Sequence, residues 1–180
     1  MKSNIFRLII LILLVLLKPS FAQSSLGLTE SKPERSFDAK ELATKMLLSK
    51  SVVVYLAPLI YIAERGLTEE RLRQIGCRYE TDDAEMLAEL ARLVGQANPE
   101  AARIKSEKTF EPREAIYLQS LGGSRTTLLF DRYSTNVPNA EGMVDNKKIS
   151  ASQSVISDIY RWAAKLPPVE KCESFLRQYR

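Results

Sequence analysis

The carboxylates are the first side chains to consider for acid–base chemistry in this sequence, because the chain contains no histidine. That absence removes Ser-His-Asp triads, Cys-His pairs and histidine-containing zinc sites. A pair of carboxylates can still cleave a glycosidic bond when one of them has a raised pKa. The competing interpretation, which we favour, is that the acids are solvated surface charges. The candidate acids stand in the second half of the chain: Glu111, Glu114, Asp131, Glu141 and Asp145.

Other catalytic and ligand-binding signatures are missing from the sequence. There is no Gly-x-Ser-x-Gly elbow, no Ser-x-x-Lys pair of the penicillin-binding type, and no dinucleotide or P-loop glycine pattern. Asp145 and Asn146 could contribute to calcium binding, but the twelve-residue spacing of a calcium loop is absent. We therefore expect no catalytic residue, no cofactor and no metal site, and we favour a non-enzymatic protein while the glycan-cleaving alternative stays open.

The N-terminus has the layout of a secretory signal peptide. Two basic residues precede an uninterrupted apolar run from Leu8 to Leu17, and the small residues Ser20 and Ala22 suit a cut before Gln23. A membrane anchor is the alternative, but a span needs roughly 20 apolar residues and this run is half as long. We expect residues 1–22 to be removed and the mature protein to be periplasmic or secreted, with no stable membrane span.

Removal of the signal peptide changes the charge and defines the domain. Cleavage takes three basic residues and no acids, so the formal charge falls from +4 to +1. A nearly neutral chain lacks the clustered cations that nucleic-acid binding needs. Residues 23–36 are polar and predict a flexible leader, and residues 37–180 suit a single globular domain with its own core.

The only two cysteines, Cys77 and Cys172, are predicted to form a disulfide in an oxidising compartment. Such a bridge would close a long loop, which the chain-entropy model values at roughly 4–5 kcal/mol. A catalytic thiol is the alternative, but it would need a base that a histidine-free chain does not offer.

The apolar pattern predicts an α+β domain of about five helices packed with a small antiparallel β-hairpin or sheet. Asp38, Thr68 and Asp82 or Asp83 are expected to cap helices, because each precedes helical spacing of apolar residues. Residues 51–63 predict a core helix, with a buried strand as the alternative. Gly122-Gly123-Ser124 between two β-rich runs predicts a hairpin over residues 115–130. Ser150 with Gln153 predicts the start of another helix, and a final helix is expected to carry Cys172.

The polar segment 131–148 is the candidate binding surface. Polar connections of this length are uncommon inside a small domain and often carry recognition, although a mobile loop with a further strand near residues 142–149 is the alternative. A second candidate surface is Tyr160-Arg161-Trp162, although Trp162 is more typical of a core residue. The predicted partner-binding residues are Arg132, Tyr133, Asn136, Asn139 and Asp145.

Taken together, the sequence favours an exported, non-catalytic binding protein that covers or plugs a protein partner. A concrete case is a periplasmic inhibitor or immunity protein that blocks an exported cell-wall-degrading toxin, since that task needs a stable scaffold but no catalytic group. Two alternatives stay open: a histidine-independent, glycan-cleaving enzyme that uses two carboxylates, and a structural subunit of an envelope assembly.

Overall fold

The computed structural model describes residues 37–57, 66–102, 109–131, 139–167 and 176. The chain divides into two compact units, Met1–Glu34 and Arg35–Arg180, and every described residue belongs to the second. The predictions for the signal peptide and the leader therefore fall outside the described residues. The elements are α2 (Ala39–Leu47), β1 (Ser49–Leu56), α3 (Glu69–Ile75), β2 (Cys77–Thr81), α4 (Ala84–Gln96), β3 (Glu100–Ala101), β4 (Pro112–Ser120), β5 (Arg125–Asp131), β6 (Asn139–Val144), β7 (Lys147–Ser152) and α5 (Ser154–Ala163).

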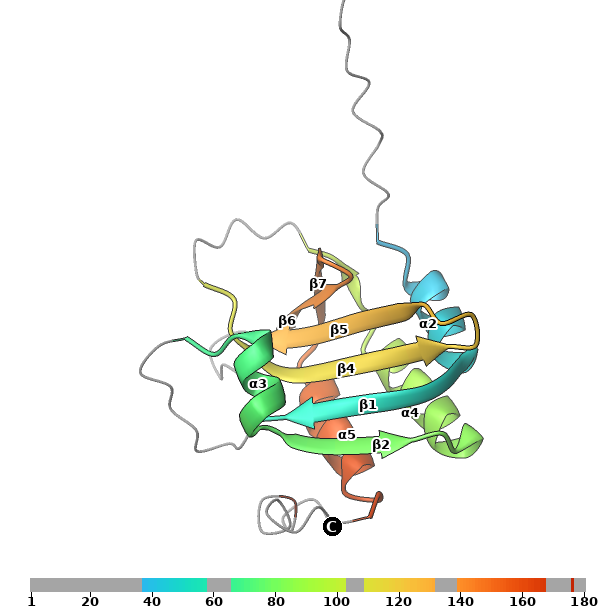
Figure 1. Cartoon of the computed structure of the whole chain (residues 1–180). Helices are drawn as coiled ribbons and strands as arrows, with labels where there is room; N and C mark the ends of the chain where they lie inside the picture. Colours follow the sequence, from blue (N-terminus) through green and yellow to red (C-terminus); the bar gives the residue numbers. More distant parts are fainter. Residues whose placement is uncertain (1–36, 58–65, 103–108, 132–138, 168–175, 177–180) are drawn as a thin grey trace, which may run out of the picture. The chain divides into compact units, whose positions relative to one another are not determined.

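The strands of the described residues form one antiparallel sheet in the order β2-β1-β4-β5-β6-β7-β3. Strands β4 to β7 follow one another as a meander, and β1 pairs with the other side of β4. In the middle of the sheet, Ile116 lies opposite Val54 on one side and Leu128 on the other. Figure 1 shows α3 on one face of this sheet and α2, α4 and α5 on the opposite face.

Helices on both faces divide the apolar side chains of the central strands into two clusters. In β1, Val52, Val54 and Leu56 belong to the larger cluster with α2, α4 and α5, whereas Val53 and Tyr55 pack on the smaller cluster beneath α3. Successive side chains of a strand point to opposite faces, so a strand covered on both faces is an almost continuous apolar run. The sheet core is thus built from both faces of β1 and β4.

The predicted balance of helix and sheet was wrong. The described residues contain four helices and a seven-stranded sheet rather than about five helices and a small hairpin. Much of the difference lies in residues 51–63, predicted as a core helix, because residues 51–56 belong to β1 and residues 58–65 lie outside the described part. The physical reason is the burial of β1 on both faces, which erases the alternation that marks an ordinary strand.

The polar segment 131–148 was also misjudged in part. Residues 139–144 and 147–152 form the β6–β7 hairpin, and its two turn residues, Asp145 and Asn146, have φ of 47° and 68°. Positive φ at both central residues is what a type I′ hairpin turn requires. The predicted helix start at Ser150 was wrong as well, because Ser150 lies in β7 and α5 begins at Ser154.

Local capping and turn predictions were confirmed. The side chain of Asp38 accepts a hydrogen bond from the backbone amide of Lys40 at 2.8 Å. The side chain of Asp83 accepts one from the backbone amide of Met86, also at 2.8 Å. Thr68 caps α3 in the same way, and the predicted hairpin is the β4–β5 pair. Trp162, predicted to be core, is fully buried, and its Nε1 donates to the carbonyl of Met86 at 2.8 Å. The helix caps depend on short-range hydrogen bonds that sequence patterns report directly.

Cys77 is buried at the start of β2, and the described part of the chain contains no free thiol. Cys172 and most of the predicted final helix lie outside the described residues, where only Leu176 is described, as a buried helical residue. The pairing of Cys77 with Cys172 therefore stays a prediction. Thiol labelling of the denatured, unreduced mature protein should detect no free thiol, and two labelled thiols would refute the pairing.

A substitution at Gly142 in β6 tests how tightly the sheet is packed. A Cβ at this position would lie 2.7 Å from the carbonyl oxygen of Leu129 and 3.1 Å from the ring of Phe130. We expect Gly142→Ala to lower the free energy of unfolding by about 1–3 kcal/mol, the usual cost of overpacking. Gly95→Ala in α4 is the control, because its Cβ would meet nothing within 4 Å. Urea denaturation should show the control unchanged or stabilised by up to about 1 kcal/mol.

Candidate functional site

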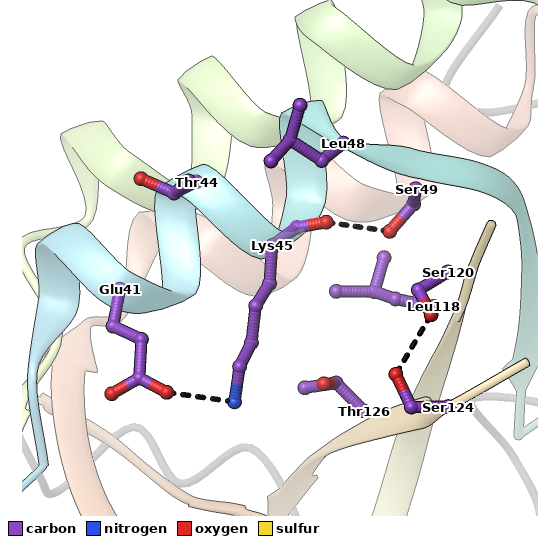
Figure 2. A pocket seen from close by; sticks show the side chains of 9 residues that line it. All are labelled: Glu41, Thr44, Lys45, Leu48, Ser49, Leu118, Ser120, Ser124 and Thr126. Atoms are coloured by element: carbon purple, nitrogen blue, oxygen red, sulfur yellow. Dashed lines mark hydrogen bonds and ion pairs between the residues drawn. The ribbon is translucent and has the colours of Figure 1, made fainter. Parts of the chain in front are cut away.

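A groove of about 450 Å³ opens between α2 and the end of the β4–β5 hairpin. Figure 2 shows α2 as one wall, with the Lys45 side chain extending along it, and the strand ends that carry Leu118, Ser120, Ser124 and Thr126 as the other. The groove is lined by Glu41, Thr44, Lys45, Leu48, Ser49, Leu118, Ser120, Ser124 and Thr126. Its size lies in the range of small-ligand pockets and of the hollows that accept side chains of a partner.

Hydrogen bonds hold both walls of the groove in place. On the α2 side, the amide of Leu48 donates to the carbonyl of Thr44 at 3.0 Å, and the hydroxyl of Ser49 donates to the carbonyl of Lys45 at 2.7 Å. These bonds satisfy carbonyl groups at the end of the helix and direct the chain into β1. On the hairpin side, the hydroxyls of Ser120 and Ser124 lie 2.7 Å apart across the turn.

The charges of the groove compensate each other. The Nζ of Lys45 lies 3.0 Å from Glu41 Oε1 and 3.8 Å from Asp145 Oδ2. The hydrogen bond and the charge of Lys45 lower the pKa of Glu41, so this carboxylate stays ionised at neutral pH. The other groove residues are leucines, serines and threonines. The groove therefore suits an uncharged occupant that combines apolar contact with hydroxyl hydrogen bonds.

Three leucines are exposed either in this groove or next in sequence to its residues. Leu47, Leu48 and Leu121 have exposed fractions of 59%, 65% and 82%, and they are the only large hydrophobic residues that are exposed in the described part of the chain. Leu48 lines the groove itself, Leu47 precedes it at the end of α2, and Leu121 follows the groove residue Ser120. We call these three leucines and the groove the leucine-rimmed groove.

Of the predicted partner-binding residues, only Asn139 and Asp145 belong to the part of the chain that the structure describes. Arg132, Tyr133 and Asn136 lie outside the described residues. Asn139 begins β6, while Asp145 follows the end of that strand, so the two stand about 20 Å apart along an extended chain. Asp145 has a structural role: its Oδ1 accepts from the amide of Thr127 at 2.8 Å, and its own amide donates to the carbonyl of Thr127 at 3.0 Å.

Three of the candidate acids meet at the opposite end of β4 and β5. Glu114 and Asp131 are buried, with exposed fractions of 2% and 5%, and Asp131 Oδ1 accepts from the amide of Glu111 at 2.9 Å. Burial raises the pKa of Glu114 to about 8, a shift typical of catalytic acids. A catalytic acid must nevertheless contact its substrate, and none of the three lines the groove. Glu141 and Asp145 belong instead to β6 and its turn.

A further polar cluster fastens α3 to the sheet. The hydroxyl of Tyr117 donates to Glu69 Oε1 at 2.7 Å, and the guanidinium of Arg125 lies 3.7 Å from the centre of the Tyr117 ring. Burial and the neighbouring Glu69 raise the pKa of Tyr117, so its hydroxyl stays neutral and is a poor nucleophile. The described residues also contain no group of three or more acidic, cysteine or histidine side chains placed to hold a metal ion.

The leucine-rimmed groove was missed by the sequence analysis, although signals for it were present. Leu42 and Met46 form the buried stripe of α2, and Leu47 and Leu48 lie off that stripe at the end of the helix. Leu121 stands directly before the Gly122-Gly123 turn, where an apolar side chain has no strand to pack against. Apolar residues outside the buried pattern of an element are the signal that could have indicated this surface.

Comparison of this chain with protein-family models, curated proteins and solved structures finds no match. Within the described residues, no helix has the length and apolar character needed to cross a membrane. The site is therefore interpreted from its own geometry alone.

The structural role of Asp145 can be tested with two substitutions. Asp145→Ala removes the acceptor of the Thr127 amide and places alanine at a φ of 47°, so we expect the free energy of unfolding to fall by about 1–3 kcal/mol. Asp145→Asn keeps an oxygen acceptor and tolerates this φ, and should change stability by less than about 0.5 kcal/mol. Urea denaturation measures both, and equal stability of the alanine variant and the wild type would reject the role.

Proposed function

We propose that this chain is an exported, non-catalytic binding protein and that the leucine-rimmed groove contacts its protein partner. The observation that carries the proposal is the exposed Leu48 in a concave surface, with the exposed Leu47 and Leu121 next in sequence to the groove residues Leu48 and Ser120. Single exposed leucines are ordinary on protein surfaces, whereas apolar side chains gathered at a hollow mark interaction sites. The contact surface thus differs from the polar segment 131–148 that the sequence suggested.

The groove has the features of the centre of a protein interface. Burying one leucine side chain contributes about 2 kcal/mol, so three leucines around a hollow can supply much of a binding free energy. The hydroxyls of Thr44, Ser120 and Ser124 offer hydrogen bonds beside them. The paired charges of Glu41 and Lys45 avoid the cost of desolvating an unpaired ion.

The proposed compartment and the concrete case rest on the sequence. A predicted signal peptide and a predicted disulfide both favour a periplasmic or secreted protein. Within that setting, we propose an inhibitor or immunity protein that blocks an exported cell-wall-degrading toxin. The task requires a firmly held projecting surface, and the β4–β5 turn with Leu121 beside the groove would supply one. The alternative of glycan cleavage is less well supported, because the buried Glu114 offers a substrate little access.

A double substitution of the rim tests the proposal. Leu48→Ser with Leu121→Ser removes apolar side chains that are exposed, so the thermal midpoint should stay within about 2 °C of that of the wild type. Affinity for the partner captured from a periplasmic extract of the native cells should fall at least tenfold, since buried leucines at an interface contribute more than 1.4 kcal/mol together.

Arg92→Ser on α4 is the control for this experiment, because Arg92 is exposed and does not line the groove. Mature protein carrying this substitution should capture the same partner with unchanged affinity, as measured by calorimetry with the purified pair. Unchanged affinity of the double leucine variant would reject the groove as the contact surface. Failure of the wild-type protein to retain any partner would count against the binding function itself.

A further inference from the structure

Glu114 is a fully buried carboxyl group at the junction of β1, β4 and α5. The strand pairing places it opposite Leu56 of β1 and Phe130 of β5, on the face that α5 covers. The hydroxyl of Tyr160, from α5, lies 2.9 Å from Glu114 Oε1 and 3.2 Å from the carbonyl oxygen of Ala57. The Tyr160 hydroxyl therefore connects α5 to Glu114 of β4 and to Ala57, which directly follows β1.

The number of hydrogens at this junction favours a protonated Glu114. The Tyr160 hydroxyl carries one hydrogen, so it cannot donate fully to both the carboxylate and the Ala57 carbonyl. Glu114 Oε2 is buried and accepts no hydrogen bond. A proton on Glu114 Oε1 removes the first problem, because the acid can donate to the Tyr160 oxygen while the tyrosine donates to Ala57. It lessens the second, because Oε2 is then the carbonyl oxygen of a neutral acid and not part of a buried charge. Without that proton, a buried charge would keep a single hydrogen bond, which is costly.

The charged groups around Glu114 do not reverse this preference. Burial is the largest influence and raises the pKa, whereas the Tyr160 hydrogen bond and the charge of Arg113 lower it. Asp131, from β5, raises it again. The net pKa is about 8, compared with an ordinary value of 4.5.

We propose that Glu114 is a proton switch in the junction of β1, β4 and α5. While protonated, it joins the helix to both strands through Tyr160. When it loses its proton, the buried charge loosens α5 from the sheet. This inference is independent of the proposed binding function, because the junction shares no residue with the leucine-rimmed groove.

The sign of the pH dependence follows from the raised pKa. The unfolded chain releases the Glu114 proton near pH 4.5, whereas the folded protein keeps it to about pH 8. Between these values the folded state holds one more proton, so the folding equilibrium constant falls about tenfold per pH unit as the pH rises. The stabilisation is complete below pH 4.5 and lost by about pH 8. The chain has no histidine, so no other side chain ordinarily titrates across pH 6 to 8.

Loosening of α5 can be observed through the only tryptophan of the chain. Trp162 lies on α5 two residues after Tyr160, is fully buried, and donates to the carbonyl of Met86 in α4. Its fluorescence in the folded wild-type protein should shift to longer wavelength with a midpoint near pH 8. Glu114→Gln, a neutral isostere of the protonated acid, should abolish the shift and remove the pH dependence of urea denaturation between pH 6 and 8.

Two further variants keep the test decisive. Tyr160→Phe removes the hydroxyl that is hydrogen-bonded to Glu114 and through which the protonated acid holds α5, so the fluorescence midpoint should move away from that of the wild type. Glu141→Gln makes the same chemical change on the partly exposed surface of β6 and should behave like the wild type. The proposal is overturned if wild-type fluorescence does not change up to pH 9, or if the change persists in Glu114→Gln. If that variant does not fold, an unmoved midpoint in Tyr160→Phe overturns it instead.

Discussion

The burial of β4 on both faces is the constraint on which the rest of the structure depends. Its residues from Pro112 to Leu118 are all buried, between β1 and β5 within the sheet and between helices on its two faces. A strand with apolar side chains on both faces needs packed elements on each face, because apolar surface left exposed to water would cost about 25 cal/mol per Å². The larger helical layer supplies that cover on one face and α3 supplies it on the other.

The two ends of β4 lie in different surroundings. At its beginning, Glu114 and the neighbouring Asp131 are buried, and the hydroxyl of Tyr160 from α5 lies 2.9 Å from Glu114 Oε1. At its end, the chain emerges from the core at Ser120 and turns beside α2. There the leucine-rimmed groove lies between α2 and the β4–β5 hairpin. The proposed proton switch thus lies at one end of β4, and the proposed contact surface lies at the other.

The separation of these two ends has a physical advantage for a binding protein. Exposed leucines are tolerable only when the fold does not rely on them, and each of the three can be changed without opening the core. The groove walls are held by backbone hydrogen bonds of Leu48 and by the turn at Ser120 and Ser124. A surface held in this way loses little conformational entropy on binding.

The sequence by itself determined the features that depend on neighbouring residues. The caps at Asp38, Thr68 and Asp83 and the glycine turn of the β4–β5 hairpin were predicted correctly, because each is a local interaction between side chain and backbone. Only the tertiary structure decided that β1 is a strand, since its apolar run suits either a buried helix or a strand covered on both faces. The burial of Glu114 and the meeting of Leu48 with Leu118 and Ser120 in one groove likewise required contacts between segments far apart in the chain, which no local pattern records.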